Sequence, residues 1–353
     1  MSVRETEGTS NYEYVTARVR KRWALLFDEE DYRKLLRMGP SEIARYMEET
    51  EYETEINALG SRYDGVDLIE YALNRNLAKH FDDLLRWADG RLYAMIARYL
   101  RKFDAWNVKT VVRGIYSGAD ADTIQSDLIR AGEFDGRFLD RLTEAGSIEE
   151  AVEILDNTRY GDPLADAYAD YEDTGTLVPL ENAVDRAYYE GLMEGVEGER
   201  DRATELYAEF LQAEIDFRNV RNALRIARSG ADIDPSEYFI EGGRLFDAAE
   251  LGQLATNTDE LVARIRDSTY GDELAEALDE LERADSLIGF EHALEAALLE
   301  YSDHLSHVFP LSVCPVLAYV LAKEREVDNI RAIARGREAG LSEDQIENEL
   351  VIL

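Results

Sequence analysis

The residues best suited to metal chemistry lie in one short segment, Asp303-His304-x-x-His307, with Glu300 one turn earlier. Imidazole and carboxylate groups at helical spacing could hold a cation. A carboxylate-bridged di-metal bundle, however, places a Glu three residues before each ligating His. None of the four histidines has a Glu at that position. We therefore expect neither a metal site nor a cofactor.

Other chemistries also lack their sequence signals. The chain contains no Gly-Lys dipeptide of a P-loop and no Gly-x-Ser-x-Gly nucleophile turn. Gly191, Gly195 and Gly198 lie between helical segments and not after a strand, which argues against a dinucleotide-binding fingerprint. The single cysteine, Cys314, precedes Pro315 in an apolar run that is typical of a buried, inert thiol. We expect no catalytic residue and no enzymatic activity of the chain's own.

The charge balance limits the possible partners. The chain has 75 acidic and 39 basic residues, and only six of the basic ones are Lys. A net charge of −36 argues against binding nucleic acid or an anionic bilayer by charge. The acid-rich, Lys-poor composition indicates a cytoplasm at very high salt, where the screening length falls to about 3 Å. No window reaches 18 apolar residues, so we expect a soluble or peripheral protein.

One polar pattern occurs three times and reveals the organisation of the chain. It reads acid, two residues, Asn, five residues, Arg, four residues, Gly, and the copies are offset by 112 and then 110 residues. Such internal periodicity indicates a repeat architecture. The three copies are Asp104, Asn107, Arg113 and Gly118; Asp216, Asn219, Arg225 and Gly230; and Glu326, Asn329, Arg335 and Gly340.

Tyr52, Tyr160 and Tyr270 keep the same period, and the last two begin the near-identical segments Tyr-Gly-Asp-x-Leu-Ala. We therefore predict three diverged helical units of about 110 residues, a typical domain size. Residues 1–10 form a loose N-terminus. The units cover residues 11–130, 131–240 and 241–353.

Apolar periodicity predicts helices almost throughout from Tyr12, and the clearest runs from Asp201 to Arg228. In the third copy Lys323 interrupts the apolar stripe, and in the first copy Arg98 and Arg101 do so. Each signature Gly falls where a helix C-cap belongs. A short second helix is expected after it, over residues 121–128, 235–239 and 342–350. Ser147-x-x-Glu150 predicts a capping box.

The signature acid, Asn and Arg lie at the edges of the apolar stripe. There they suit hydrogen bonds and charge pairs to neighbouring helices, so we interpret the signature as a structural clamp repeated in each unit. One active site has no need of three identical sets tens of ångströms apart. The alternative is that some copies contact a partner.

The single basic island, from Arg18 to Trp23, contains Arg18, Arg20, Lys21 and Arg22. Three interpretations remain open for it. It could be a solvated helix face, it could pair with the protein's own acidic surface, or it could contact acidic groups of another subunit. At high salt such a contact would depend on shape and apolar burial more than on Coulomb attraction.

The repeat resembles one family over residues 11–353, namely the C subunit of the archaeal (A-type) rotary ATP synthase, the counterpart of the d subunit of vacuolar-type ATPases. The resemblance rests on Asp104-x-x-Asn107, Asp216-Phe-Arg-Asn219 and Glu326-Val-Asp-Asn329, together with the opening Tyr12-x-Tyr14-x-x-Ala17-Arg18 and the ending Leu321 to Leu341. The acidic composition suggests a salt-adapted archaeon.

The resemblance implies three all-helical domains around a pseudo-threefold axis, forming a funnel with an axial cavity. It also implies a non-catalytic component of the central stalk, peripheral on the cytoplasmic face of the cell membrane. Its partners would be the membrane proteolipid rotor ring and the central shaft subunits, with no nucleic acid and no small-molecule substrate. Proton or sodium flow would turn the ring, and this component would pass torque to the shaft for ATP synthesis. The alternatives are a generic helical scaffold without catalytic activity and an enzyme using the His304 cluster or an axial cavity.

Overall fold

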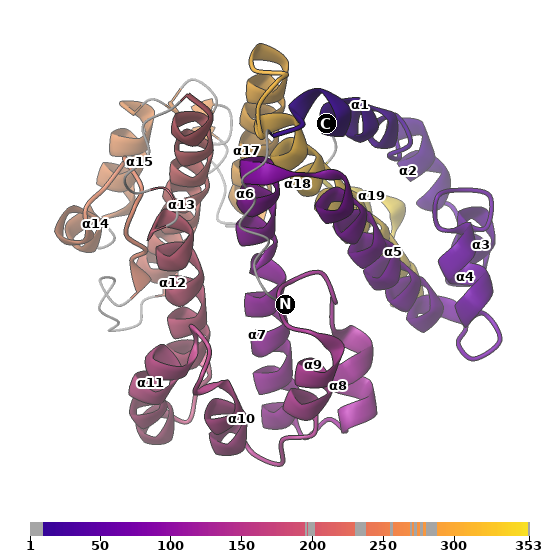
Figure 1. Ribbon diagram of the computed structural model, residues 1–353, viewed down its shortest axis with the longest axis horizontal. Helices are drawn as coiled ribbons and strands as arrows, with labels where there is room; N and C mark the ends of the chain where they lie inside the picture. Colours follow the sequence, from indigo (N-terminus) through magenta and orange to yellow (C-terminus); the bar gives the residue numbers. More distant parts are fainter. Residues whose placement is uncertain are drawn as a thin grey trace. The chain divides into compact units, whose positions relative to one another are not determined.

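The computed structural model describes residues 10–194, 196, 202–229, 238–254, 257–268, 270–271, 274–275, 278–279 and 288–351, leaving aside the side chains of residues 225–229, 258, 288 and 290. Across these ranges the regular secondary structure is helical and no strand occurs (Figure 1). The predicted all-α class is confirmed.

The chain forms two compact units. Unit 1 consists of residues 1–25 and 38–195, and unit 2 consists of residues 26–37 and 196–353. Unit 2 is therefore discontinuous, because a short segment from the N-terminal region packs with the C-terminal half of the chain. The finer division into three units, at residues 130 and 240, stays a prediction.

Unit 1 is built around two helices, α5 and α7, each of which packs against several others. Helix α5 packs against α1, α3, α4 and α6, and α7 packs against α8, α9, α10 and α12 (Figure 1). Helices α11 and α12 pack closely along each other. The helices are α1 Tyr12–Trp23, α3 Pro40–Met47, α4 Glu53–Leu59, α5 Gly65–Trp87, α6 Gly90–Leu100, α7 Lys102–Ser117, α8 Ala121–Asp127, α9 Gly136–Thr143, α10 Ile148–Leu155, α11 Gly161–Thr174 and α12 Val178–Glu194.

Unit 2 is built around α13, α17 and α18. Helix α18 packs along α17 and also contacts α13, α19 and the N-terminal helix α2, while α14 and α15 lie against α13. The helices are α2 Glu29–Leu35, α13 Arg202–Ser229, α14 Ala248–Leu254, α15 Thr258–Arg266, α17 Ile288–Val308, α18 Cys314–Glu338 and α19 Glu343–Glu347.

Side-chain caps fix where many of these helices begin. An N-cap oxygen accepts a backbone N–H of the first turn, which otherwise has no partner. At the predicted capping box, Ser147 accepts the Glu150 N–H at 3.1 Å, but the Glu150 carboxylate accepts the Gly146 N–H and not that of Ser147. The reciprocal bond thus falls one residue before the predicted position. The capping side chains in the described ranges include Asp28, Asp120, Asp135, Ser147, Asp247, Asn257 and Ser342.

The predicted helices agree with the structure where it describes them. The long helix expected over 201–228 is α13, and those expected over 121–128 and 342–350 are α8 and α19. The short helix expected after the second copy, over 235–239, falls mostly outside the described residues. In the first copy the long helix is divided into α6 and α7 at Arg101. Arg101 is one of the two Arg residues that interrupt the apolar stripe there.

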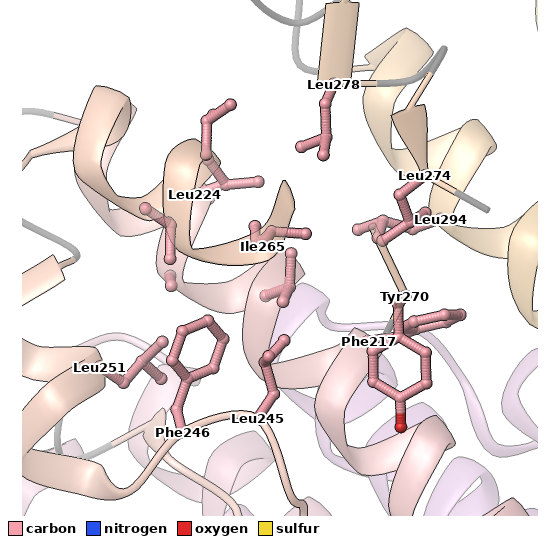
Figure 2. Close-up of a cluster of buried hydrophobic side chains, with 14 of the residues drawn as sticks. Phe217, Leu224, Leu245, Phe246, Leu251, Ile265, Tyr270, Leu274, Leu278 and Leu294 are labelled. Atoms are coloured by element: carbon pink, nitrogen blue, oxygen red, sulfur yellow. The ribbon is translucent and has the colours of Figure 1, made fainter. Parts of the chain in front are cut away.

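A buried hydrophobic cluster joins α13, α14, α15 and α17 within unit 2 (Figure 2). Phe217 on α13 meets the Tyr270 ring edge-on, with the ring centres 4.9 Å apart. Leu224 and Leu261 are fully buried in the same cluster. The burial of these apolar side chains is the main force holding the four helices together, at about 1.5–3 kcal/mol for each large side chain.

Cys314 is buried at the start of α18, and burial raises the pKa of its thiol. Within the described part of the chain, no helix combines the length and the apolar character needed to cross a bilayer.

Candidate functional site: the repeated polar clamp

The signature asparagine makes the same pair of hydrogen bonds in all three copies, which we call the Asn clamp. Its amide nitrogen donates to a backbone carbonyl 21 or 22 residues later, and its amide oxygen accepts the N–H of that same residue. All six bonds measure 2.8–3.1 Å, and all three asparagines are buried. Only an amide offers a donor and an acceptor in this arrangement. The pairs are Asn107 with Ile129, Asn219 with Ile240 and Asn329 with Val351.

The signature acid binds backbone N–H groups a few residues beyond the Asn clamp. Asp104 accepts from residues 133 and 134 at 2.7 and 3.0 Å. Asp216 accepts from residues 244 and 245 at 2.8 and 2.9 Å. Two N–H groups converging on one carboxylate fix the direction in which the chain enters the next helix, α9 or α14 respectively.

A glycine just before each of these N–H pairs allows the carboxylate to approach. A Cβ on Gly132 would overlap the Asp104 carboxylate, and a Cβ on Gly243 would overlap that of Asp216. Any larger residue would push the loop off its acid. These two glycines were missed in the sequence, although both lie three residues after the residue held by the Asn clamp.

The third acid receives its backbone partner from a distant part of the chain. Glu326 accepts the Phe27 N–H at 2.6 Å, across a separation of 299 residues. Phe27 precedes Asp28, the N-cap of α2, and α2 packs on α18. The segment of residues 26–37 therefore takes the place in this copy that the loops before α9 and α14 take in the other two. A sequence signal existed, since Phe-Asp also precedes α9 at 134–135 and α14 at 246–247.

Burial changes the acidity of the clamp acids. Burial raises the pKa of Asp104 to about 6, against the lowering effect of the bonded N–H groups of residues 133 and 134. Burial likewise raises the pKa of Asp216, while its N–H partners and the Tyr270 hydroxyl oppose the rise. Both carboxylates are engaged by the chain's own backbone, which is the arrangement of a structural group rather than that of an acid or base facing a substrate.

The repeated tyrosines lie beside these acids in two copies. Tyr270 donates its hydroxyl to Asp216 at 3.0 Å. Burial, followed by the charge of Asp104, raises the pKa of Tyr160. Tyr52 is also fully buried. Each tyrosine N–H donates to a hydroxyl two residues earlier, which belongs to Thr50, Thr158 or Ser268.

Lys323 is the residue whose role the sequence concealed. It interrupts an apolar stripe, yet its side chain is only 1% exposed and donates to Glu326 at 2.6 Å. The matching residue of the first copy, Arg101, pairs with the half-exposed Glu133 at 2.7 Å. The matching residue of the second copy is Ala213. Of the three matching positions, only that of the third copy therefore holds a buried cation bound to the signature acid.

The signature arginine and glycine have separate roles. Arg113 binds Glu181 through two hydrogen bonds of 2.6 and 2.8 Å, which joins α7 to α12. Arg335 is exposed. Gly118 and Gly340 have φ values of 76° and 75° and end α7 and α18. The Arg225 side chain and Gly230 lie outside the described residues.

The basic island divides into a paired residue and an exposed group. Arg22 binds Asp83 at 2.7 Å and approaches Glu51 at 3.6 Å, so it pairs with the protein's own acidic surface. Arg18, Arg20 and Lys21 are exposed, and within the described ranges none of them pairs with a carboxylate.

The histidine segment forms no metal centre in the region that the structure covers. His304 and His307 are both exposed. The His307 ring lies 3.0 Å from the Asp303 carbonyl and 3.4 Å from its carboxylate. Among the described residues, no group of three His, Cys, Asp or Glu side chains is placed to hold a metal ion.

Comparison with known proteins assigns the chain to a family. The model of the family described as ATP synthase (C/AC39) subunit matches residues 15–349. Proteins named as the C subunit of an A-type ATP synthase are 70% identical in Haloferax volcanii, over 99% of both chains, and 66% identical in Halorubrum lacusprofundi, over 98% of this chain and 99% of that one. The one from Methanococcoides burtonii is 36% identical over 99% of this chain and 97% of its own. The chain therefore belongs to the ATP synthase (C/AC39) subunit family.

Proposed function

We propose that this protein is the central-stalk coupler of a rotary ATP synthase. It links the proteolipid rotor ring in the membrane to the central shaft, so that ion flow through the membrane drives ATP synthesis elsewhere in the complex. The protein carries torque and has no catalytic role of its own. It works as a peripheral protein on the cytoplasmic face of the cell membrane.

The observation that carries this proposal is the full-length membership in a family whose relatives are named as the C subunit of an A-type ATP synthase. The threefold Asn clamp fits the same role. A part that transmits torque must resist local opening, and each clamp closes two buried backbone groups on the side chain of a long helix. Three such units arranged around a pseudo-threefold axis would make a funnel whose cavity receives the shaft.

The composition supports work in a cytoplasm at molar salt. Relatives at 64–70% identity come from halophilic archaea such as Haloferax volcanii and Halobacterium salinarum. A net charge of −36 is tolerable when salt reduces the screening length to about 3 Å. Association with other subunits should therefore be tested in molar KCl, because dilute buffer would exaggerate repulsion between acidic surfaces.

The test is affinity purification of the tagged full-length chain from detergent-solubilised membranes of its native cell, in molar KCl. We expect the proteolipid and the shaft subunits to be recovered with about one copy of this chain per complex. An untagged strain is the control for non-specific recovery. Recovery of neither partner, with the chain entirely in the soluble fraction, would refute the coupler role.

A further inference from the structure

The exposed end of the basic island differs from the rest of this acidic protein. Arg18, Arg20 and Lys21 lie within four positions of one another on α1, and Glu13 is the only acidic residue of that helix. The chain as a whole carries 75 acidic residues against 39 basic ones. By helical spacing, Tyr14, Arg18 and Lys21 share one face of α1, and Arg20 lies further round its exposed side. None of the three cations is bound to a carboxylate in the described ranges, so this side of the helix forms a positive patch on a negative background.

Two aromatic rings hold one of these cations in place. The Arg18 guanidinium lies 4.6 Å from the centre of the Tyr14 ring and 5.0 Å from that of Trp87 on α5. Tyr14 is 48% exposed. Stacking restrains the guanidinium while leaving its edge available, and that edge is what binds a carboxylate through two parallel hydrogen bonds.

Three acids on α5 or just after it are engaged with other groups. Asp83 is bound to Arg22, Asp82 pairs with Arg86, and the Asp89 N–H and carboxylate bind Asn11. Helix α1 is anchored to the rest of unit 1 by buried Val15 and Val19 and by its packing on α5 (Figure 1). The helix is therefore held in place, and none of its three exposed cations forms an ion pair with a carboxylate of the described chain.

We propose that Arg18, Arg20 and Lys21, with Tyr14, form a docking surface for an acidic segment of another protein in the complex, a helix or loop carrying at least two neighbouring carboxylates. The proposal rests on the proposed function, since it identifies one surface through which the coupler binds its complex. Charge complementarity favours such a segment, and Arg and Tyr are the residue types enriched where protein interfaces derive most of their affinity. Direct bidentate contacts persist at molar salt, whereas long-range attraction does not.

The experiment repeats the purification with the full-length variant Arg18→Glu/Arg20→Glu/Lys21→Glu. The control variant is Arg45→Glu/Arg137→Glu/Arg186→Glu, which makes the same charge change at three exposed arginines elsewhere in unit 1. We expect recovery of partner subunits to fall at least about tenfold with the first variant and to stay near wild type with the control. Because Arg18 stacks on Trp87, Arg20→Glu/Lys21→Glu is tested as well, with circular dichroism to establish that both variants fold.

The outcomes separate the two proposals. Failure of the wild-type chain to recover any partner refutes the coupler role itself. Recovery by the wild type and equal recovery by the α1 variants refutes the docking surface while leaving the coupler role intact. Binding of the wild type to protein-free phosphatidylglycerol vesicles in molar KCl, lost in the α1 variants, would assign the patch to an anionic membrane and also refute docking to a protein.

Discussion

Asp104 in unit 1 and Glu326 in unit 2 both accept a backbone N–H from the segment that begins a helix, but those segments reach them along very different lengths of chain. The separation is 29 residues for Asp104 and Glu133, and 299 residues for Glu326 and Phe27. Closing a loop ten times longer costs about 2 kcal/mol more in chain entropy. The third copy therefore needs a stronger contact to hold its distant segment than the first copy needs.

The side chains of the two copies differ in a way that gives the third copy the stronger contact. The first copy uses an Asp and a Gly in close contact, and its neighbouring cation, Arg101, is directed to an exposed carboxylate. The third uses the longer Glu and adds the buried Lys323. A charge-assisted hydrogen bond from an ionised carboxylate is about twice as strong as a neutral one. In the third copy the carboxylate that accepts the Phe27 N–H therefore also accepts a charge-assisted hydrogen bond from the Lys323 ammonium.

Among the substitutions that test this difference, Lys323→Met should cause the largest loss of stability. Removing the cation leaves a buried carboxylate without its charge partner, which costs about 3–5 kcal/mol. We expect urea unfolding in molar KCl, followed by circular dichroism, to show unit 2 destabilised by that amount. All three tryptophans, Trp23, Trp87 and Trp106, belong to unit 1, so fluorescence follows unit 1 separately.

The matched control is Arg101→Met in the first copy. Its ion pair is partly exposed, so the cost should be only about 0–1 kcal/mol. Replacing both members of the buried pair, as Lys323→Met/Glu326→Gln, should recover part of the lost stability because no unpaired charge remains. Equal costs for Lys323→Met and Arg101→Met would mean that the third copy gains nothing from burying its pair.

The next effect is a pH dependence carried by Asp104. Its pKa is raised to about 6 from 3.8, so the folded state holds this proton more tightly than the unfolded state does. The stabilisation is complete below the unfolded pKa and is lost as the pH rises through about 6, a total of about 3 kcal/mol. Asp104→Asn should remove this pH-dependent contribution. It is measured as the difference in free energy of unfolding of unit 1 between wild type and variant, at pH values from below 3.8 to above about 6.

Asp120 provides a control of opposite sign within the same unit. The Thr123 N–H lowers the pKa of this N-cap carboxylate, so its contribution is present above the unfolded pKa and is lost on acidification. The difference between wild type and Asp120→Asn should therefore grow with pH where that for Asp104→Asn shrinks. A difference for Asp104→Asn that stays flat between the two pKa values would show that burial does not raise the pKa of Asp104.

The contrast also shows what the sequence could and could not predict. The signature positions repeat at fixed spacing, so the threefold pattern and the long helices that carry it are visible in the sequence. The groups held by the Asn clamp are backbone groups, which any residue possesses, and only the aliphatic types of Ile129, Ile240 and Val351 hint at them. Lys323 looks like an interruption because its partner Glu326 and its burial appear only once the helices are packed.

Removal of the Asn clamp should cost the first and third copies equally. Asn107→Ala and Asn329→Ala each leave one buried N–H and one buried C=O without a partner, at about 1–3 kcal/mol for each group left unsatisfied. We expect similar total losses of about 2 kcal/mol, which is the lower limit for two such groups together, read from fluorescence for unit 1 and from circular dichroism for unit 2. A much larger loss in one copy would mean that its clamp also holds contacts beyond the two hydrogen bonds.

The smallest effect expected is at the glycines that end α7 and α18. Gly118 and Gly340 have nearly the same left-handed φ, and the residue after each donates to the carbonyl of Gly114 or Gly336 at 2.9 Å. An L-residue is strained in this conformation whatever the space around it, so Gly118→Ala and Gly340→Ala should each cost about 1 kcal/mol. Since a Cβ at either position meets no atom within 4 Å, packing should add nothing to that cost. Urea unfolding of the two variants should therefore show the same small loss in free energy of unfolding, in unit 1 for Gly118→Ala and in unit 2 for Gly340→Ala. A clearly greater loss for Gly340→Ala would show that the end of α18, unlike that of α7, also depends on the segment of residues 26–37 packed along that helix.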